Sequence, residues 1–239
     1  MPLVPIDCLR RQPVHHIVSL GCACEVAFNL RRFYSFATAY PFDWWISSPH
    51  GVADLIGSAD IDALYDDRML HLSANAEAVK NSRFDISLHH EFSRDWKSPG
   101  HPVITPFYPS IAAAKKRTFF LFDRLLSLDK KDTRIAFIRM SSSSDEGYTE
   151  RNSIIDALSY RFNKSLFTLI YVNGRFSTDE VDSVVNITFE NEKYFGWKGN
   201  PARWDAGLHS LGLQLQPGIH RTVTEMDLRA QHAATMMPL

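Results

Sequence analysis

The segment SLGCACEVAFNL, residues 19–30, carries the side chains best suited to covalent chemistry. A short apolar strand is predicted before Gly21, and a helical pattern begins at about Cys24. Glycine allows a sharp turn between the two elements. The free N–H groups and positive partial charge of a helix N-terminus lower a thiol pKa and can stabilise an oxyanion. Cys24 is therefore a candidate nucleophile, and the alternative is a small buried hydrophobe at the turn.

A cysteine nucleophile needs a base, which is usually histidine, and a third group that orients the base. Among ten histidines, His90 in LHHEF is favoured, because alternation after Leu88 places it on the apolar face of a predicted strand. The alternative is a hydrogen-bonded core histidine. Asp43 lies among aromatic residues in PFDWW, where a carboxylate must be paired. It either supports the catalytic site or caps its own turn.

Several other residues are candidates for substrate binding. Arg139, at the end of RIAFIR, has a planar guanidinium that binds carboxylate or phosphate, although a surface ion pair explains it equally well. Trp197, in WKGNPARW, either stacks on a sugar or another ring or anchors a core. Ligands in parallel α/β folds lie beyond the carboxyl ends of the strands. The expected contacts at those ends are Ser19, Gly21, Ser141 and Asn173.

The sequence predicts no metal and no cofactor. Cys22, Cys24, His89 and His90 are suitable zinc ligands by type, but C-x-C and H-H spacing fits no common zinc pattern. No GxxxxGK[ST] motif is present, and no GxGxxG follows the first strand, which disfavours a nucleotide-driven enzyme. The three cysteines are no disulfide framework and indicate a reducing compartment.

Composition narrows the class of partner. The net charge of −1 argues against nucleic acid or an anionic membrane as the main partner. No signal-type apolar stretch and no run of 18 apolar residues occurs, so we expect a cytoplasmic protein without a membrane span. The expected partner is a small-molecule, glycan or peptide substrate. The sequence gives no indication of the oligomeric state.

The hydrophobic patterns alternate between strands and helices along one predicted domain, residues 1–239. Strands are expected at 17–20, 83–92, 134–140, 166–172 and 185–190. Helices are expected at 24–33, 51–57, 59–65, 111–128 and 150–162, and a capping box predicts a short one after Ser177. This order predicts an α/β fold with a mostly parallel central sheet and helices on both faces, in three layers. The exceptions are an N-terminal arm at 1–13, an irregular insert around 82–109 and a weakly patterned tail at 210–239.

Three motifs resemble those of a bacterial family of unknown function described as putative papain-like cysteine peptidases. The matching residues are Ser19, Leu20, Gly21, Cys24 and Ala27, then Pro41, Phe42, Asp43 and Trp44, then His90, Glu91 and Phe92. Glu91 stands where the family usually has aspartate. The segments KKRTFFLFDRLL…RIAFIR and GWKGNPARW are also similar, so the resemblance spans roughly residues 15–205.

The resemblance implies a cysteine nucleophile and a histidine, and an acyl or glycan substrate, since members occur among surface-polysaccharide genes. The favoured interpretation is a cysteine-dependent hydrolase or acyltransferase in which Cys24 attacks a carbonyl, His90 is the base and Asp43 supports the site. The alternative is a non-catalytic or transferase-type domain that binds a sugar or nucleotide in surface-polysaccharide biosynthesis, where Cys24 only packs. A third possibility is an effector or scaffolding protein.

Overall fold

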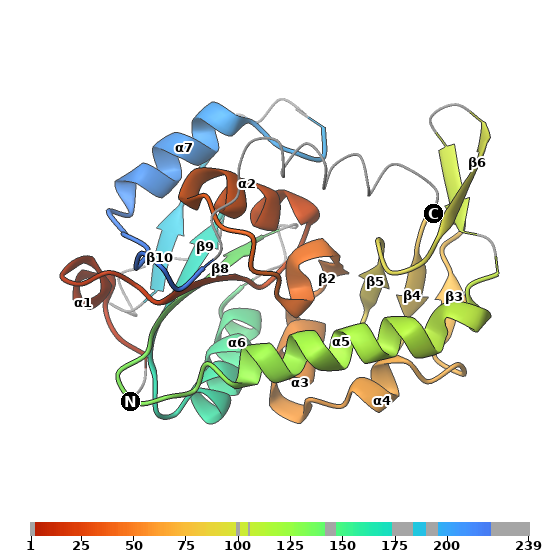
Figure 1. The fold of residues 1–239 in the computed structure, drawn as a ribbon, viewed down its shortest axis with the longest axis horizontal. Coiled ribbons are helices and arrows are strands. Elements are labelled where there is room, and N and C mark those ends of the chain that lie inside the picture. The colour runs from red at the N-terminus through yellow and green to blue at the C-terminus, as the bar shows by residue number, and fades with distance from the viewer. Residues whose placement is uncertain are drawn as a thin grey trace.

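A computed structural model of the chain describes residues 3–98, 101–104, 106–141, 147–173, 184–189 and 196–220. Its centre is a parallel four-stranded sheet in the order β1-β8-β9-β10 (Figure 1). The strands are β1 (His16–Ser19), β8 (Arg134–Met140), β9 (Leu166–Val172) and β10 (Val184–Ile187). The predicted parallel sheet is confirmed, and the bounds of β8 and β9 match the expected ones because both strands are continuous apolar runs.

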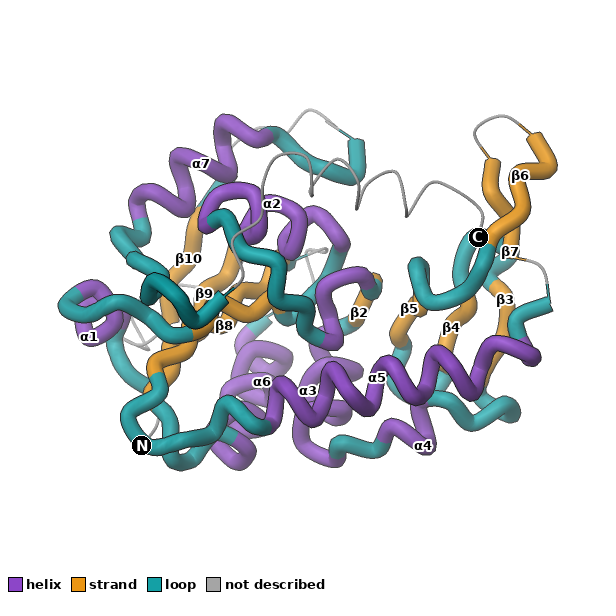
Figure 2. The backbone as a smooth tube through the Cα atoms, in the orientation of Figure 1, coloured by secondary structure: helices purple, strands orange, loops and turns teal. Residues whose placement is uncertain are grey.

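Helices cover both faces of this sheet (Figures 1 and 2). One face carries α1 (Ile6–Arg10), α2 (Cys24–Tyr34) and α7 (Pro201–Ser210), and the other carries α3 (Pro49–Ser58), α5 (Ile111–Leu126) and α6 (Tyr148–Arg161). Successive strand residues point to opposite faces. Ile17 and Ile138 belong to the hydrophobic cluster under α2 and α7, whereas Val18 and Phe137 belong to the cluster over α3, α5 and α6. The expected three-layer α/β fold is confirmed.

A second, antiparallel sheet lies beside the first, with β2 as the edge strand nearest to it (Figure 1). Its strands, in the order β2-β5-β4-β3, are β2 (Ile46–Ser47), β5 (Ile86–Leu88), β4 (Val79–Asn81) and β3 (Leu70–Leu72). A hairpin follows, made of β6 (Arg94–Ser98) and β7 (His101–Ile104). The expected irregular insert at 82–109 is thus more regular than predicted, since it contains β5, β6 and β7. Strand β5 falls in the expected strand at 83–92, whereas β6 and β7 were not predicted, because their polar residues and Pro102 leave no sustained apolar alternation. Strands β2, β3 and β4, of two or three residues, are too short to show a period.

The remaining differences from the expected elements are local. Helix α1 lies inside the expected irregular arm, and α7, which was not predicted, begins within the WKGNPARW segment. Asn200 caps α7 by accepting hydrogen bonds from the N–H groups of Ala202 and Arg203, and Pro201 occupies the first helical position. The expected strand at 83–92 is shorter, because β5 ends at Leu88 and a turn follows. The predicted helix after Ser177 lies outside the described residues.

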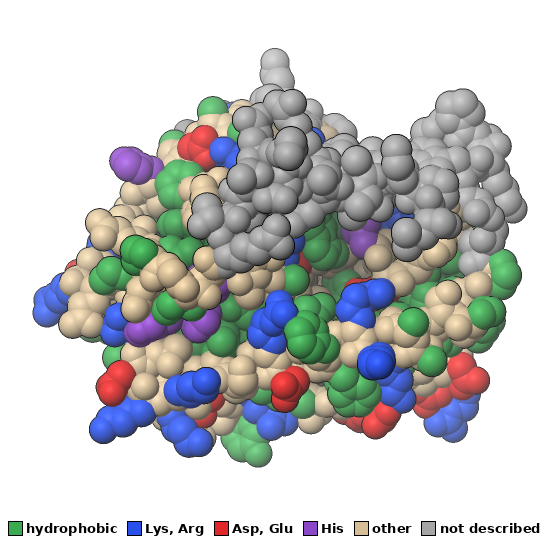
Figure 3. Space-filling view, viewed as in Figure 1, with side chains coloured by type: hydrophobic (Ala, Val, Ile, Leu, Met, Phe, Trp, Pro, Cys, Tyr) green, Lys and Arg blue, Asp and Glu red, His purple; other side chains and the backbone are tan. Residues whose placement is uncertain are grey.

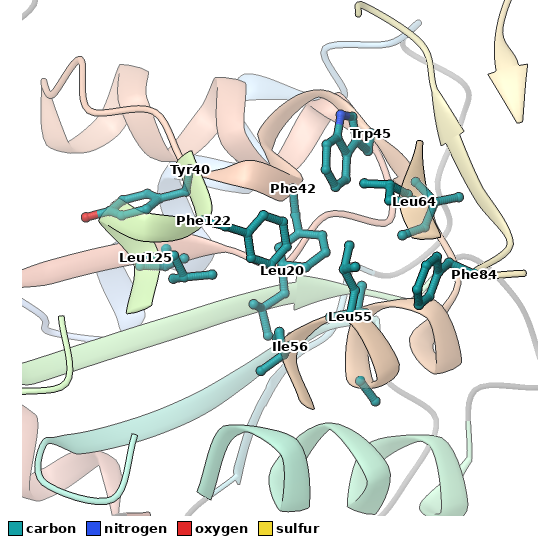
Figure 4. Packing of buried hydrophobic residues seen from close by; sticks show 14 of the residues in the cluster. Leu20, Tyr40, Phe42, Trp45, Leu55, Ile56, Leu64, Phe84, Phe122 and Leu125 are labelled. Carbon is teal, nitrogen blue, oxygen red and sulfur yellow. The ribbon is translucent and has the colours of Figure 1, made fainter. Parts of the chain in front are cut away.

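The two sheets share one hydrophobic core. Figure 4 shows Phe42 and Trp45 packed near Phe122 of α5, with Leu20 at the end of β1 beside them. Phe42 lies within a short 3-10 helix, η1 (Pro41–Trp44), Trp45 follows its last residue, and the two rings meet edge to face. The helix α4 (Ile61–Leu64) and a second 3-10 turn, η2 (Tyr108–Ser110), complete the described elements. Within the described ranges, no helix combines the length and the apolar character needed to cross a bilayer.

Candidate active site around Cys24

A tight turn at the carboxyl end of β1 positions the candidate nucleophile. Gly21 and Cys22 both have left-handed backbone conformations, with φ of 76° and 80°. The N–H of Gly21 donates to Ser19 Oγ, and the N–H of Cys22 donates to Ser47 Oγ, each at 3.1 Å. A Cβ at position 21 would lie 2.6 Å from Ser47 Oγ, so glycine is required there. After this turn, Cys24 is the first residue of α2.

The Cys24 thiol is buried and neutral in this conformation. The residue is only 8% exposed, and burial raises its pKa to about 12. A hydrogen bond from its own N–H and the positive charge of Arg94 act in the opposite direction, whereas the charge of Asp43 adds to the increase. Ala23 precedes α2 in an extended conformation and its side chain provides no cap. The start of α2 thus has no side-chain cap, although the N–H of Val26 donates to the carbonyl of Ala23, and burial dominates the state of the thiol.

Asp43 joins η1 to α2. Its carboxylate accepts a hydrogen bond from the N–H of Tyr40 at 2.8 Å and forms a buried ion pair with Arg31 of α2. Burial raises the pKa of Asp43 above its ordinary value, while Arg31 and the Tyr40 N–H counteract that change. These partners agree with the second of the two roles considered from the sequence, in which Asp43 caps its own turn. Within the described part of the chain, neither carboxylate oxygen is hydrogen-bonded to His90, so the expected orienting contact is not made in this conformation.

His90 lies in the turn after β5, against the aromatic part of the PFDW motif. Its ring centroid lies 5.8 Å from that of Trp44 and 4.9 Å from that of His89. Trp44 also contacts the guanidinium of Arg31, at 5.2 Å. Burial lowers the pKa of His90 to about 3, with His89 and Arg94 as further causes. The structure thus brings His90 to Trp44, but no hydrogen bond joins His90 to Cys24 among the described residues.

Glu91, the next residue, links the third motif to the second. One carboxylate oxygen accepts a hydrogen bond from Trp45 Nε1 at 3.1 Å, and the other accepts one from Arg117 Nε at 3.1 Å. The Glu91 side chain is 8% exposed, so this bonding compensates for its desolvation. The turn at His90 is therefore fixed on the Trp45 side by Glu91.

Arg94 was missed by the sequence reasoning. Its Nη2 donates to the carbonyl oxygen of His89, and its charge acts on the pKa values of Cys24, His89 and His90. A single arginine at the start of a short strand belongs to none of the three motifs. The only available signal was its position four residues after His90, where a turn returns the chain toward the histidines.

A family model described as "Putative papain-like cysteine peptidase (DUF1796)" matches residues 15–172. The chain belongs to this family. No curated protein matches the chain. The region shared with the cysteine peptidase family runs from just before β1 to the end of β9, so it contains the Cys24 turn, η1 and the His90 turn. Helix α7 lies outside it. The resemblance expected from the motifs is confirmed for the first four-fifths of its span.

Most expected substrate-binding residues at the strand ends hold the backbone. Arg139 is fully buried and donates to the carbonyl oxygens of Leu20 and Ser47, at 3.1 and 3.0 Å, which ties β1 to β2. Asn173 closes β9 onto β10: its N–H donates to the carbonyl of Ile187 and its Oδ1 accepts from the N–H of Phe189, both at 2.7 Å. The buried Arg139 and the partly buried Asn173, with backbone partners, are positioned for structure first.

Trp197 and Ser141 differ from these buried residues. Trp197 is 41% exposed and packs edge to face against Phe28, one helical turn after Cys24, with ring centroids 5.3 Å apart. The ammonium of Lys198 lies within 5.4 Å of both rings. Ser141 follows β8, and its N–H donates to the carbonyl of Val172. An exposed ring on the face of α2 that carries Cys24 is suited to contact a substrate.

Two further features of the described residues bear on where a second site could lie. The described residues contain no group of three or more His, Cys, Asp or Glu side chains that could hold a metal ion. A shallow depression lined by Asp62, Tyr65, Tyr108 and Lys115 lies between α4 and α5 and shares no residue with the Cys24 turn. In Figure 3, the visible face is hollowed between its two halves, and hydrophobic side chains lie in this hollow.

Proposed function

We propose that this protein is a cysteine-dependent hydrolase or acyltransferase in which Cys24 is the nucleophile and His90 is the base. The observation that carries the proposal is the place of Cys24, the first residue of α2 after a left-handed turn at the end of β1. Membership of a family described as cysteine peptidases supports it. The substrate would be an acyl compound, whether peptide, glycan ester or small molecule, and we expect no nucleic-acid partner and a cytoplasmic location.

The reaction requires one proton transfer for each bond that is made or broken. A nitrogen of His90 takes the thiol proton while Cys24 Sγ attacks the substrate carbonyl carbon. The N–H groups of the first turn of α2 stabilise the oxyanion. The leaving group departs with the proton from the imidazolium, which leaves a thioester on Cys24. Water, or an acceptor nucleophile in a transferase, then attacks the thioester with His90 as base, and the thiol is restored by the returned proton.

This chemistry needs a conformation other than the one described. With pKa values of about 12 for Cys24 and about 3 for His90, proton transfer between them is unfavourable by on the order of 10 kcal/mol. Burial is the largest cause of both shifts, so admission of solvent or of a polar substrate would reduce both. A proton also moves only within hydrogen-bond reach. We therefore infer that the turn at His90 moves toward α2 when substrate binds.

In this proposal Asp43 is a positioning residue. It fixes η1 against α2 through Arg31 and so sets the place of Trp44, on which His90 packs. The proposed substrate contact is the exposed ring of Trp197, which packs on Phe28, one turn along α2 from Cys24. The backbone around Gly21 and Ser141 would contribute further contacts. Ser19, Arg139 and Asn173 maintain the strand ends on which these groups are held.

A non-catalytic domain that binds a sugar or nucleotide is the second candidate. The observation that favours it is the burial of Cys24, since a binding protein has no need of an accessible thiol. In that case Cys24 packs at the turn as a small hydrophobe, and Trp197 alone contributes to ligand contact.

The pH dependence of alkylation by iodoacetamide, measured at each cysteine by peptide mass spectrometry, separates the two candidates. The chain contains its own controls, because Cys8 is exposed and Cys22 is 2% exposed. The proposal requires that the conformation with the His90 turn moved toward α2 is also visited without substrate, so a nucleophilic Cys24 should react at least tenfold faster than Cys22 in the folded protein. His90→Ala should slow it severalfold without changing Cys8. If Cys24 stays as unreactive as Cys22 until the protein unfolds, the catalytic proposal is wrong and the binding domain replaces it.

A further inference from the structure

We propose that Arg94 and His89 form a binding site for an oxyanion, a carboxylate or a phosphate, beside Cys24. Resting on the proposed function, this assigns the substrate class: an acyl compound that carries a negatively charged group. Neither residue belongs to the nucleophile–base pair, and the family description does not mention a charged substrate.

Two buried nitrogens in this turn have no hydrogen-bond partner. They are Arg94 Nε and His89 Nδ1, and each is shielded from solvent while the described residues offer it no acceptor or donor. Buried polar atoms in native proteins are nearly always paired, so each exception needs an explanation. Two exceptions five residues apart, in the same turn beside the candidate nucleophile, are most simply explained by a polar ligand that bonds to both.

The guanidinium of Arg94 is anchored and still has donors to offer. Its Nη2 donates to the carbonyl oxygen of His89, which places the group against the histidine turn. Other arginines of the chain, such as Arg31, Arg32 and Arg117, form ion pairs with carboxylates. In the described part of the chain, Arg94 forms no such pair. An arginine fork binds carboxylate or phosphate through two parallel N–H bonds, and Nε–H is one edge of that fork.

His89 completes the arrangement as a neutral donor. Burial and the charge of Arg94 lower its pKa to about 4, so the imidazole is uncharged at neutral pH and can donate from one nitrogen. Glu77 is the acidic group that acts on both His89 and Arg94. It is engaged with Asn75, whose Nδ2 donates to it at 2.7 Å, and does not form an ion pair with Arg94 within the described ranges. Glu77 keeps its negative charge and partly offsets that of Arg94, so Arg94 itself is the positive group offered to a ligand.

The position next to Cys24 distinguishes this site from a general surface contact. His90, the neighbour of His89, packs on Trp44, and Trp44 contacts Arg31 of α2. The charge of Arg94 also acts on the pKa of the Cys24 thiol. An anion bound at Arg94 would thus bring the rest of its molecule to the start of α2. The competing role for Arg94 is that of a simple counter-ion for a Cys24 thiolate, with no ligand.

The test is a titration of the ¹⁵N-labelled full chain with acetate and with inorganic phosphate at constant ionic strength, followed by amide chemical shifts. We expect saturable shifts centred on residues 88–94 and the first turn of α2. Arg94→Gln should weaken binding at least tenfold, Arg94→Lys and His89→Gln severalfold, and the exposed Arg83→Gln should leave it unchanged. Whichever anion binds more tightly identifies the charged group of the substrate.

Equal affinity in Arg94→Gln, or shifts that are scattered and do not saturate, would overturn the site. So would a change in Cys24 reactivity in Arg94→Gln without any anion binding to the wild type, since that is the counter-ion role. If Arg94→Gln does not fold, the wild-type shift map and His89→Gln still decide. Cys24→Ser should bind the anion normally, so failure of the catalytic proposal, read from alkylation, remains distinguishable from failure of this site.

Discussion

The buried ion pair between Arg31 and Asp43 is the residue-scale feature on which the site most depends. The two side chains are only 5% and 3% exposed, so both charges have lost their hydration. A buried ion pair stabilises a protein little more than two well-packed apolar side chains in its place would. Removal of one partner, however, leaves the other charge buried alone, which is strongly destabilising. The same pair determines where Trp44, and hence His90, can lie.

We expect Asp43→Asn to lower the free energy of unfolding by about 3–5 kcal/mol, because Arg31 would remain buried without a counter-charge. The matched control is Asp205→Asn. It removes the ion-pair partner of Arg32, which follows Arg31 on α2. Asp205 is 46% exposed, so its loss should cost less than about 1 kcal/mol. Urea denaturation at pH 7 measures both. Equal losses in the two variants would show that the buried pair is not the stronger constraint.

At the scale of the element, the β1–α2 turn is defined by close packing as well as by backbone conformation. Gly21 is held between Ser47 Oγ and the carbonyl oxygen of Phe42, 2.6 and 3.1 Å from the position of an added Cβ. Ser47 cannot rotate away freely, because its Oγ accepts the hydrogen bond from the N–H of Cys22. A side chain at position 21 would therefore disturb the turn that presents Cys24.

We expect Gly21→Ala to destabilise the protein more than Gly196→Ala does. Both glycines have similar left-handed φ values, 76° and 74°, but nothing lies within 4 Å of a Cβ at Gly196. Gly196→Ala should therefore cost only the conformational strain, about 1 kcal/mol. Gly21→Ala adds overpacking and should cost about 1–3 kcal/mol more. Chemical denaturation of the two variants gives the difference, and a difference near zero would mean that Ser47 moves without cost.

The elements that could be predicted from the sequence are those with long, continuous or periodic apolar patterns. Strands β8 and β9 and helices α2, α5 and α6 are of this kind. Helix α7 was missed because it has only two buried positions, Trp204 and Leu208, in a polar segment. Its start was nevertheless marked by Asn200 and Pro201. Of the small sheet only β5 was predicted, within the expected strand at 83–92, because β2, β3 and β4 have two or three residues each and show too little periodicity.

Residues of the candidate site could be predicted from the sequence only where they belong to a recognisable motif. Cys24 at the start of a helix followed from the strand–glycine–helix pattern, and this placement is confirmed. The pattern could not tell that Arg139 points into the core and bonds to Leu20 and Ser47, because a strand end fixes the backbone position and not the burial of the side chain. Arg94 belongs to none of the motifs, and the sequence does not show that a turn brings it back to the carbonyl of His89.

At the scale of the whole molecule, partly buried histidines with lowered pKa values occur both at the central sheet and at the small sheet. His16, at the start of β1, bonds to the hydroxyl of Tyr40 at 3.0 Å and packs on His220, whose Nδ1 bonds to Thr38. This group holds the segment up to residue 220 beside β1. His89 and His90 lie at the other sheet. Burial is the largest cause of the lowered pKa in all of them.

These histidines predict that acid destabilises the fold well before the carboxylates titrate. The pKa of His16 is about 4 in the folded protein, against about 6.5 when unfolded, so the unfolded state binds more protons between these values. The stability that the neutral form provides is present above pH 6.5 and is lost as pH falls toward 4. Between pH 7 and pH 4.5 His16 alone should account for a loss of about 2–3 kcal/mol in the free energy of unfolding.

The free energy of unfolding of His16→Gln should therefore fall by that much less than that of the wild type between pH 7 and pH 4.5, as measured by urea denaturation at the two pH values. His50→Gln, at a side chain that is 71% exposed, is the control and should keep the wild-type pH dependence. If His16→Gln retains the full wild-type loss, the acid sensitivity arises elsewhere, and the same comparison with His89→Gln tests the other sheet.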